Sequence, residues 1–195
     1  ILSDDIYEHV KFDNFKFFTV AQIKKLKDRT LTMNGVSKAY AMTGWRIGYA
    51  AGPKNIIAAI RKIQSQSTSN PSSISQAAAV EALNGSQSFI KKRAKSFSDR
   101  RNFVVNYLNS IQGITCLMPK GAFYVFPSCK GLIGKKTKIK DDTDFVQKLL
   151  EKQNVAVVQG SAFGLDGYFR ISYATSMQKL KVAMARIKLF CESLG

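Results

Sequence analysis

Lys38 and Arg46 are the two side chains of this sequence around which a chemical site can be built. Lys38 lies between small and hydroxylated residues in a glycine-punctuated turn, and Arg46 follows eight residues later, directly after the only tryptophan. The residues on either side, 30–33 and 47–51, have the composition of short strands. Desolvation at a strand-to-loop junction and a neighbouring cation both lower the pKa of a lysine. We therefore expect Lys38 to present a free amine, as a Schiff-base lysine must.

The segment from Ser37 to Tyr49 reads Ser-Lys-Ala-Tyr-Ala-Met-Thr-Gly-Trp-Arg-Ile-Gly-Tyr. It resembles the cofactor-lysine segment of fold-type I (class I/II) aminotransferases, which use pyridoxal 5'-phosphate. Within this family it is most similar to the segment of the bacterial aspartate aminotransferases. The order of elements along the whole chain fits the family, but it corresponds only to about the C-terminal half of a usual member. The resemblance therefore implies a pyridoxal-phosphate site whose N-terminal contributions are not visible in this sequence.

The resemblance also implies roles for four residues in or just before this segment. Lys38 would form the Schiff base with the cofactor and then move the proton between the substrate Cα and the cofactor. Arg46 would clamp the cofactor phosphate through its forked guanidinium, and Ser37 and Asn34 would add phosphate contacts. Gly35 stands where some relatives carry a phosphate-binding serine, so that contact is not implied here.

Asp4 and Tyr7 match the family's Asp-x-x-Tyr signature, a few dozen residues before Lys38. In the family, a carboxylate at the pyridine nitrogen keeps that nitrogen protonated, and a phenol three residues on can hydrogen-bond the 3-oxygen of the ring. Asp5 competes with Asp4 for the first role. The spacing favours Asp4, because alternation along a strand sends Asp5 to the other face.

Arg170 lies in Tyr-Phe-Arg-Ile-Ser-Tyr-Ala, which matches the family's Phe-Arg-Ile-Ser-x-Ala pattern. The resemblance implies that this arginine binds the α-carboxylate of the substrate as a fork-to-fork pair. On a strand, Arg170 points opposite to Phe169 and Ile171, which predicts a guanidinium directed into a cleft.

The expected fold class is α/β. Residues 1–85 are expected to form the second half of the pyridoxal-phosphate large domain, a doubly wound and mostly parallel sheet. Residues 86–195 are expected to form a smaller α+β C-terminal domain, entered by a long linking helix. Besides the strands flanking Lys38, the expected elements of residues 1–85 are a strand over 1–3, a short helix over 21–26, a helix after Pro53, a loop over 65–70 and a helix from Pro71 to Asn84. The packed residues of that last helix are expected to be Ile74, Ala77, Ala78, Val80, Ala82 and Leu83.

In residues 86–195 we expect a long helix over 88–111, strands over 114–118 and 123–126, and a loop over 130–140. A helix capped by Asp142 or Thr143 follows, with Phe145, Val146, Leu149 and Leu150 facing inward. Strands over 155–158 and 168–173 and a last helix from about Ser176 complete this part.

Composition excludes several classes of protein. With 195 residues, 45% of them hydrophobic, the chain can bury a core, and no apolar run is long enough to span a bilayer. The first residues do not read as a signal peptide, and the absence of an initiator Met suggests a start inside a longer protein. Three widely spaced cysteines and a single histidine form no metal-ligand pattern and indicate reduced thiols in a cytoplasmic protein.

The net charge of +17 also suits a nucleic-acid-binding module. The basic residues are instead spread over helices and over the loop 130–140, without interleaved aromatic residues, which favours a solvated surface and no nucleic-acid or membrane partner.

The function implied by the resemblance is pyridoxal-phosphate-dependent transamination between an L-amino acid, with aspartate first, and 2-oxoglutarate. Aromatic or prephenate-type substrates are the near alternative. An alternative of another class is a truncated, inactive fragment, or one piece of a nicked enzyme that needs its N-terminal half. The expected partners are the amino-acid and 2-oxo-acid substrates, a second copy of the chain in a homodimer, and that N-terminal half.

Overall fold

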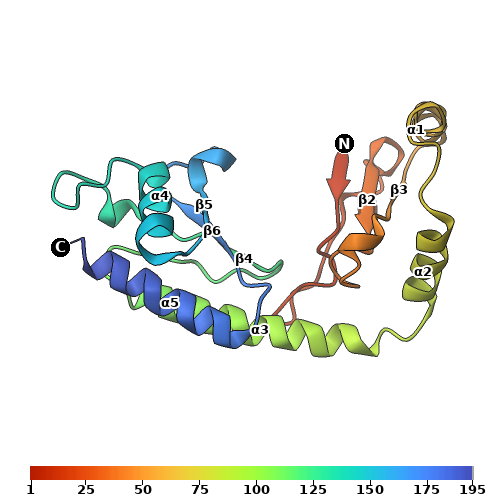
Figure 1. Cartoon of the computed structure of the whole chain (residues 1–195). Helices are drawn as coiled ribbons and strands as arrows, with labels where there is room; N and C mark the ends of the chain where they lie inside the picture. The colour runs from red at the N-terminus through yellow and green to blue at the C-terminus, as the bar shows by residue number, and fades with distance from the viewer. Residues whose placement is uncertain (195) are drawn as a thin grey trace. The chain divides into compact units, whose positions relative to one another are not determined.

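The structure is a computed structural model that describes residues 1–194. The chain divides into two compact units, Ile1–Ala94 and a second unit from Lys95 onward. The division falls inside a single long helix, α3 (Ser88–Asn109), which Figure 1 shows in green. The sequence predicts this helix almost to the residue, and the expected boundary at 85–86 lies just before it.

The first unit is built on a three-stranded sheet in the order β1-β2-β3. β1 (Leu2–Asp4) and β2 (Leu31–Gly35) are parallel, whereas β3 (Gly48–Ala51) runs antiparallel to β2. All three strands are predicted from the sequence. The helix expected over 21–26 is wrong: Ile23 has an extended backbone, so only two 3-10 turns form, at Val20–Gln22 and Lys27–Arg29.

Two helices follow the sheet, α1 (Lys54–Ser67) and α2 (Ser73–Asn84). Both are predicted, although α1 extends into the loop expected from residue 65. The expected packing of the α2 residues is wrong for Ile74, Val80 and Leu83, which are 72%, 58% and 42% exposed. Ala82 packs as expected, against the buried cluster that contains Ala79. No residue of α1 is buried, and Ile63 is 71% exposed. Both helices therefore carry apolar side chains that no element of residues 1–194 covers.

The second unit contains a three-stranded antiparallel sheet in the order β4-β6-β5. Its strands are β4 (Tyr124–Val125), β5 (Val158–Gln159) and β6 (Phe169–Ser172). The strand expected over 114–118 is wrong. Of these residues, only Thr115 forms a bridge, with Ser128. The next residue, Cys116, has its backbone groups bonded by a side chain: Asn109 accepts from the Cys116 N–H at 2.7 Å and donates to the Cys116 carbonyl at 2.9 Å.

Helices α4 (Asp142–Gln153) and α5 (Met177–Glu192) complete this unit. α5 begins next to Ser176, as the sequence predicts, and the Ser176 hydroxyl caps it by accepting a hydrogen bond from the Lys179 N–H. The cap of α4 is Asp141, which accepts from the Asp144 N–H at 2.8 Å, so the expectation of Asp142 or Thr143 is wrong. The expected inward position of Leu150 is also wrong, because it is 48% exposed.

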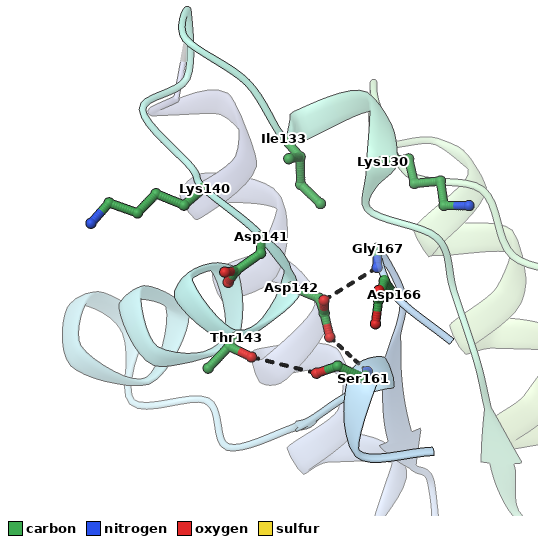
Figure 2. Close-up of a pocket in the computed structure, with 9 residues that line it drawn as sticks. All are labelled: Lys130, Ile133, Lys140, Asp141, Asp142, Thr143, Ser161, Asp166 and Gly167. Carbon is green, nitrogen blue, oxygen red and sulfur yellow. Dashed lines mark hydrogen bonds between the residues drawn. The ribbon is translucent and has the colours of Figure 1, made fainter. Parts of the chain in front are cut away.

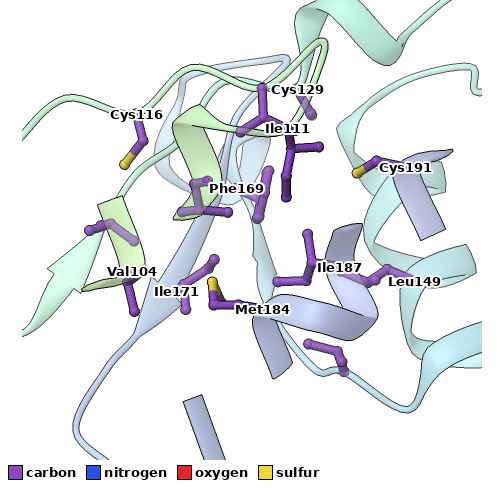
Figure 3. Packing of buried hydrophobic residues seen from close by; sticks show 14 of the residues in the cluster. Val104, Ile111, Cys116, Cys129, Leu149, Phe169, Ile171, Met184, Ile187 and Cys191 are labelled. Carbon is purple, nitrogen blue, oxygen red and sulfur yellow. The ribbon is translucent and has the colours of Figure 1, made fainter. Parts of the chain in front are cut away.

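The hydrophobic core of the second unit gathers side chains from α3, α4, α5 and the sheet (Figure 3). Phe145, Phe169 and Ile187 are completely buried within it. The three cysteines are free and buried, and burial raises the pKa of the Cys116 thiol to about 11. Protonated thiols of this kind pack as small apolar groups.

Candidate active site

Two predicted segments meet at one edge of the first sheet because β1 and β2 are parallel. Asp4 pairs with Met33, and both strands end within a few residues of this pair. The carboxyl ends of parallel strands lie at the same edge, where open α/β sheets bind ligands. The turn after β1 carries Asp4 and Tyr7, and the loop after β2 carries Ser37 and Lys38. The structure therefore brings these four residues to one edge of the sheet.

The side chains of Asp4 and Asp5 take different environments, as strand alternation predicts. Asp5 is buried and accepts a hydrogen bond from the Ser3 hydroxyl at 2.8 Å. Asp4 is exposed, and one of its carboxylate oxygens accepts a hydrogen bond from the Ile6 N–H at 3.2 Å. The carboxylate of Asp4, and not that of Asp5, is thus accessible at the edge.

Hydrogen bonds to the backbone hold the loop that carries Lys38 before and after this residue. Val36, fully buried, donates its N–H to the Ile47 carbonyl at 3.4 Å. On the far side of Lys38, the guanidinium of Arg93 donates to the Ala39 carbonyl at 2.8 Å. Lys38 itself is half-buried between these anchored residues.

A side-chain bridge that sequence reasoning missed joins the two segments. Asn34 donates from its amide nitrogen to a carboxylate oxygen of Glu8 at 2.7 Å, and its amide oxygen accepts from the Gly35 N–H at 2.7 Å. The same Glu8 oxygen lies 3.3 Å from Nε2 of His9. These bonds engage the amide of Asn34, which the sequence offers as a phosphate contact. The bridge joins residues that are far apart in sequence, and no sequence motif predicts it.

Two tyrosines surround this bridge. Burial, followed by the negative charge of Glu8, raises the pKa of Tyr40, and the same two causes together with Tyr40 raise the pKa of Tyr49. The Tyr40 hydroxyl donates to Gln87 at 3.0 Å, and its ring meets that of His9 edge-on at 6.3 Å. Both shifts favour the neutral phenol.

Arg46 lies at the end of the loop with an unusual backbone. Its φ is +54°, in the left-handed region that residues other than glycine rarely adopt, and Ala41 of the same loop also has a φ of +54°. Such backbone strain persists only where the surrounding structure imposes it, and it concentrates at functional sites. The Arg46 side chain is exposed, and one of its nitrogens donates to the Thr43 carbonyl at 2.9 Å.

Gly35 ends β2 where two backbones approach closely. A Cβ at this position would lie 2.9 Å from the Ile47 carbonyl oxygen and 3.3 Å from the Gly48 Cα. A serine here would require the paired strand β3 to shift. The departure from the family pattern seen in the sequence thus has a steric reason in this chain.

Arg170 belongs to the second unit, on the central strand β6. Its neighbours Phe169 and Ile171 are buried in the core, while Arg170 is half-buried on the other face of the sheet, as predicted. Its guanidinium carbon lies 4.6 Å from the ring centre of Tyr124 and 4.4 Å from that of Phe163. Sequence reasoning missed both rings as neighbours of Arg170.

Residues 1–194 provide neither a metal site nor a membrane-spanning helix. No three His, Cys, Asp or Glu side chains in this part of the chain gather closely enough to hold a metal ion. The helices described for it are all too short or too polar to cross a membrane.

Comparison with known proteins gives aminotransferases both from a family model and from individual sequences. The family model described as aminotransferase class I and II matches residues 1–187. The aspartate aminotransferase of Rhizobium meliloti (strain 1021) is 59% identical over 200 residues, which cover 100% of this chain and 49% of that protein. A probable aspartate/prephenate aminotransferase of Rhizobium leguminosarum bv. phaseoli is also 59% identical, over 98% of this chain and 49% of its own length.

Solved structures agree with the sequence matches. A crystal structure of the aspartate aminotransferase from Rhizobium meliloti superposes with a TM-score of 0.95 at 60% identity, covering 98% of this chain and 49% of that chain. An aromatic aminotransferase from Pyrococcus horikoshii gives a TM-score of 0.90 at 38% identity, covering 98% and 50%. These similarities confirm the predicted α/β fold class, and the chain spans about half the length of the relatives it matches. The chain belongs to the class I and II aminotransferase family.

Proposed function

We propose that this chain carries the lysine-bearing part of the active site of a pyridoxal-phosphate-dependent aminotransferase. The observation that carries the proposal is the parallel pairing of β1 and β2, which brings the Asp4–Tyr7 turn and the Ser37–Lys38 loop to one edge of a sheet. Both segments match the family's cofactor-binding motifs, and family membership supports the same reading.

The donor set at this edge fits pyridoxal 5'-phosphate group by group. It offers a carboxylate for the pyridine nitrogen (Asp4), a phenol for the 3-oxygen (Tyr7), an amine for the aldehyde (Lys38), and a hydroxyl and a guanidinium for the phosphate (Ser37 and Arg46). When bound, the cofactor supplies an electron sink for the electrons left by the departing Cα proton of the substrate.

Each residue then has a defined task. The Asp4 carboxylate would stabilise a protonated pyridine nitrogen, and the Tyr7 hydroxyl would donate a hydrogen bond to the ring oxygen. Arg46 and Ser37 would hold the phosphate. The amine of Lys38 would hold the cofactor through its aldehyde, and it would serve as the base that takes the Cα proton of the substrate and as the acid that returns it.

For the substrates, we propose an L-amino acid donor, with aspartate first, and 2-oxoglutarate as acceptor, with Arg170 binding the α-carboxylate. The relatives from Rhizobium meliloti are named aspartate aminotransferase, which supports aspartate. Others are named aspartate/prephenate aminotransferase, such as that of Cereibacter sphaeroides, so prephenate is the second candidate for the acceptor.

We further propose that the two compact units are the second half of a cofactor-binding large domain and a small C-terminal domain, corresponding to the expected division into 1–85 and 86–195. The active enzyme would also contain the N-terminal half of a usual family member, and it would assemble as a homodimer in the cytoplasm. The exposed apolar side chains of α1 and α2, among them Ile63 and Ile74, support an additional covering partner.

The test is covalent labelling of the lysine. Incubation of the protein with pyridoxal phosphate, followed by borohydride reduction and peptide mapping by mass spectrometry, is expected to place the label on Lys38. Lys38→Ala should abolish this label, whereas Lys62→Ala, a control on the exposed side of α1, should leave it unchanged. Labelling that favours any other lysine would contradict the proposed function.

A further inference from the structure

Arg170 lies on β6, the central strand of its three-stranded sheet. β6 pairs with β4 on one side and with β5 on the other. Tyr124 comes from β4, and Phe163 ends the 3-10 turn Gly160–Phe163, which directly follows β5. The two rings near the Arg170 guanidinium therefore reach it from the two sides of its own strand. We call Tyr124 and Phe163 together the aromatic clamp.

The guanidinium of Arg170 lies over both rings of the aromatic clamp. The guanidinium carbon lies over both rings, at 4.6 Å and 4.4 Å from their centres, which is within the range of a cation–π contact. Within residues 1–194, the guanidinium N–H groups make no hydrogen bond or ion pair. Arg170 is thus oriented by ring contacts while the N–H groups at its edge keep their bonding capacity.

Arg101 in the same unit shows the opposite arrangement. It is buried, and its nitrogens donate to the Pro119 carbonyl at 2.9 Å and to the Asn102 side chain at 2.8 Å and 3.0 Å. An arginine engaged in this way has a structural role. Arg170, with ring contacts and no hydrogen bond within residues 1–194, suits the capture of a planar carboxylate, which bonds two N–H groups of the fork at once.

The turn that carries Phe163 is anchored at both ends by a buried carboxylate (Figure 2). Asp142, only 2% exposed, accepts hydrogen bonds from the Ser161 N–H at 2.8 Å and from the Gly167 N–H at 3.2 Å. Phe163 lies between these two anchor points, and the Phe126 ring supports it edge-on at 5.9 Å. The position of an otherwise exposed aromatic side chain is therefore well determined.

We propose that Tyr124 and Phe163 are positioning residues, which hold the Arg170 guanidinium so that its N–H edge is ready for the substrate carboxylate. This inference rests on the proposed role of Arg170. Holding the guanidinium in place before binding reduces the entropy that the side chain loses on binding. Loss of one ring should therefore weaken carboxylate binding without removing any atom that touches the substrate.

The experiment uses the whole chain, with the arginine side chains labelled with ¹⁵N and the Arg170 Nε–Hε signal identified by its loss in Arg170→Lys. Ring currents should shift this signal upfield in the wild type, and Phe163→Leu and Tyr124→Leu should each reduce the shift. Titration with succinate, at constant ionic strength, should show a Kd raised about threefold to tenfold in Phe163→Leu, as expected for one cation–π contact.

Two further variants separate positioning from folding. Phe163→Tyr keeps the ring and should restore both the shift and the Kd. Phe103→Leu makes the same chemical change on α3, where the ring contacts Tyr107 and not Arg170, and should change neither. An Arg170 signal and a Kd that stay unchanged in Phe163→Leu and Tyr124→Leu would overturn the aromatic clamp.

The two proposals fail in different ways. Succinate binding that survives Arg170→Lys unchanged removes the proposed role of Arg170, whatever the rings do. Binding that is lost in Arg170→Lys but unchanged in Phe163→Leu removes only the aromatic clamp. A wild-type chain that does not bind succinate through Arg170 contradicts both.

Discussion

The Asp142→Asn substitution tests the anchor of the 161–167 turn. The wild-type carboxylate accepts two backbone N–H groups, from Ser161 and Gly167, and it is almost completely buried. A hydrogen bond to a charged group contributes about 1.5–3 kcal/mol to stability. The amide oxygen of asparagine can still accept one of the two bonds, while its NH₂ group faces the other N–H. We therefore expect the second unit to lose about 2 kcal/mol of unfolding free energy.

The loss should depend on pH in a defined direction. Burial alone would raise the pKa of Asp142, but hydrogen bonds from Ser161 and Gly167 outweigh it and hold the pKa below its usual range. A carboxyl group whose pKa is lower in the folded state stabilises the fold above its unfolded pKa, and this stabilisation is lost as pH falls through the folded pKa. The difference between wild type and Asp142→Asn should be complete at neutral pH and should shrink below about pH 4.

The assay combines urea unfolding at several pH values with amide hydrogen exchange. In the wild type the Gly167 N–H should exchange slowly, and Asp142→Asn should accelerate its exchange. Asp166→Asn is the matched control, since this exposed carboxylate lines the same pocket and makes no hydrogen bond within residues 1–194; its effect should stay within about 0.5 kcal/mol. Equal destabilisation of Asp142→Asn at pH 7 and pH 3 would refute the reasoning.

Two further substitutions test packing. Gly35→Ser places a Cβ 2.9 Å from the Ile47 carbonyl oxygen and should destabilise the first unit by about 1–3 kcal/mol in thermal melts, whereas Gly44→Ser, with no atom within 4 Å of the added Cβ, should not; equal melting temperatures would show that β3 yields freely. Phe145→Ala empties a completely buried site and should cost about 3–5 kcal/mol in urea unfolding, against a much smaller effect for Leu150→Ala on the exposed side of the same helix; similar losses for both would mean that the core side of α4 is misassigned.

Local sequence signals predicted most of the secondary structure. The long α3 helix and the start of α5 near Ser176 were predictable because an apolar stripe along a helix depends on residues within a few turns of one another. The cap of α4 was not, since Asp141 and Asp142 are adjacent carboxylates with the same capping chemistry. Only the fold shows that Asp141 caps the helix while Asp142 turns inward to anchor a distant turn.

Burial was less predictable than helix formation. The apolar residues of α1 and α2 have helical spacing, and the helices form, yet Ile63 and Ile74 remain exposed. Periodicity shows which residues share a face of a helix, but not whether another element covers that face. The strand expected over 114–118 is likewise reduced to one bridge between Thr115 and Ser128, and the Asn109 side chain, seven residues before Cys116, bonds the Cys116 backbone.

The sequence by itself determined the family and the candidate chemistry, since the residues from Ser37 to Tyr49 form one continuous motif whose side chains act together. Only the tertiary structure decided how distant parts of the chain come together. Parallel pairing of β1 and β2 brings the segments of Asp4 and Lys38 to one edge of the sheet, and a side-chain bridge joins Glu8 and Asn34. The two neighbours of β6 bring Tyr124 and Phe163 to Arg170. The physical reason is that strand order and register are set by long-range packing, which no local pattern of residues encodes.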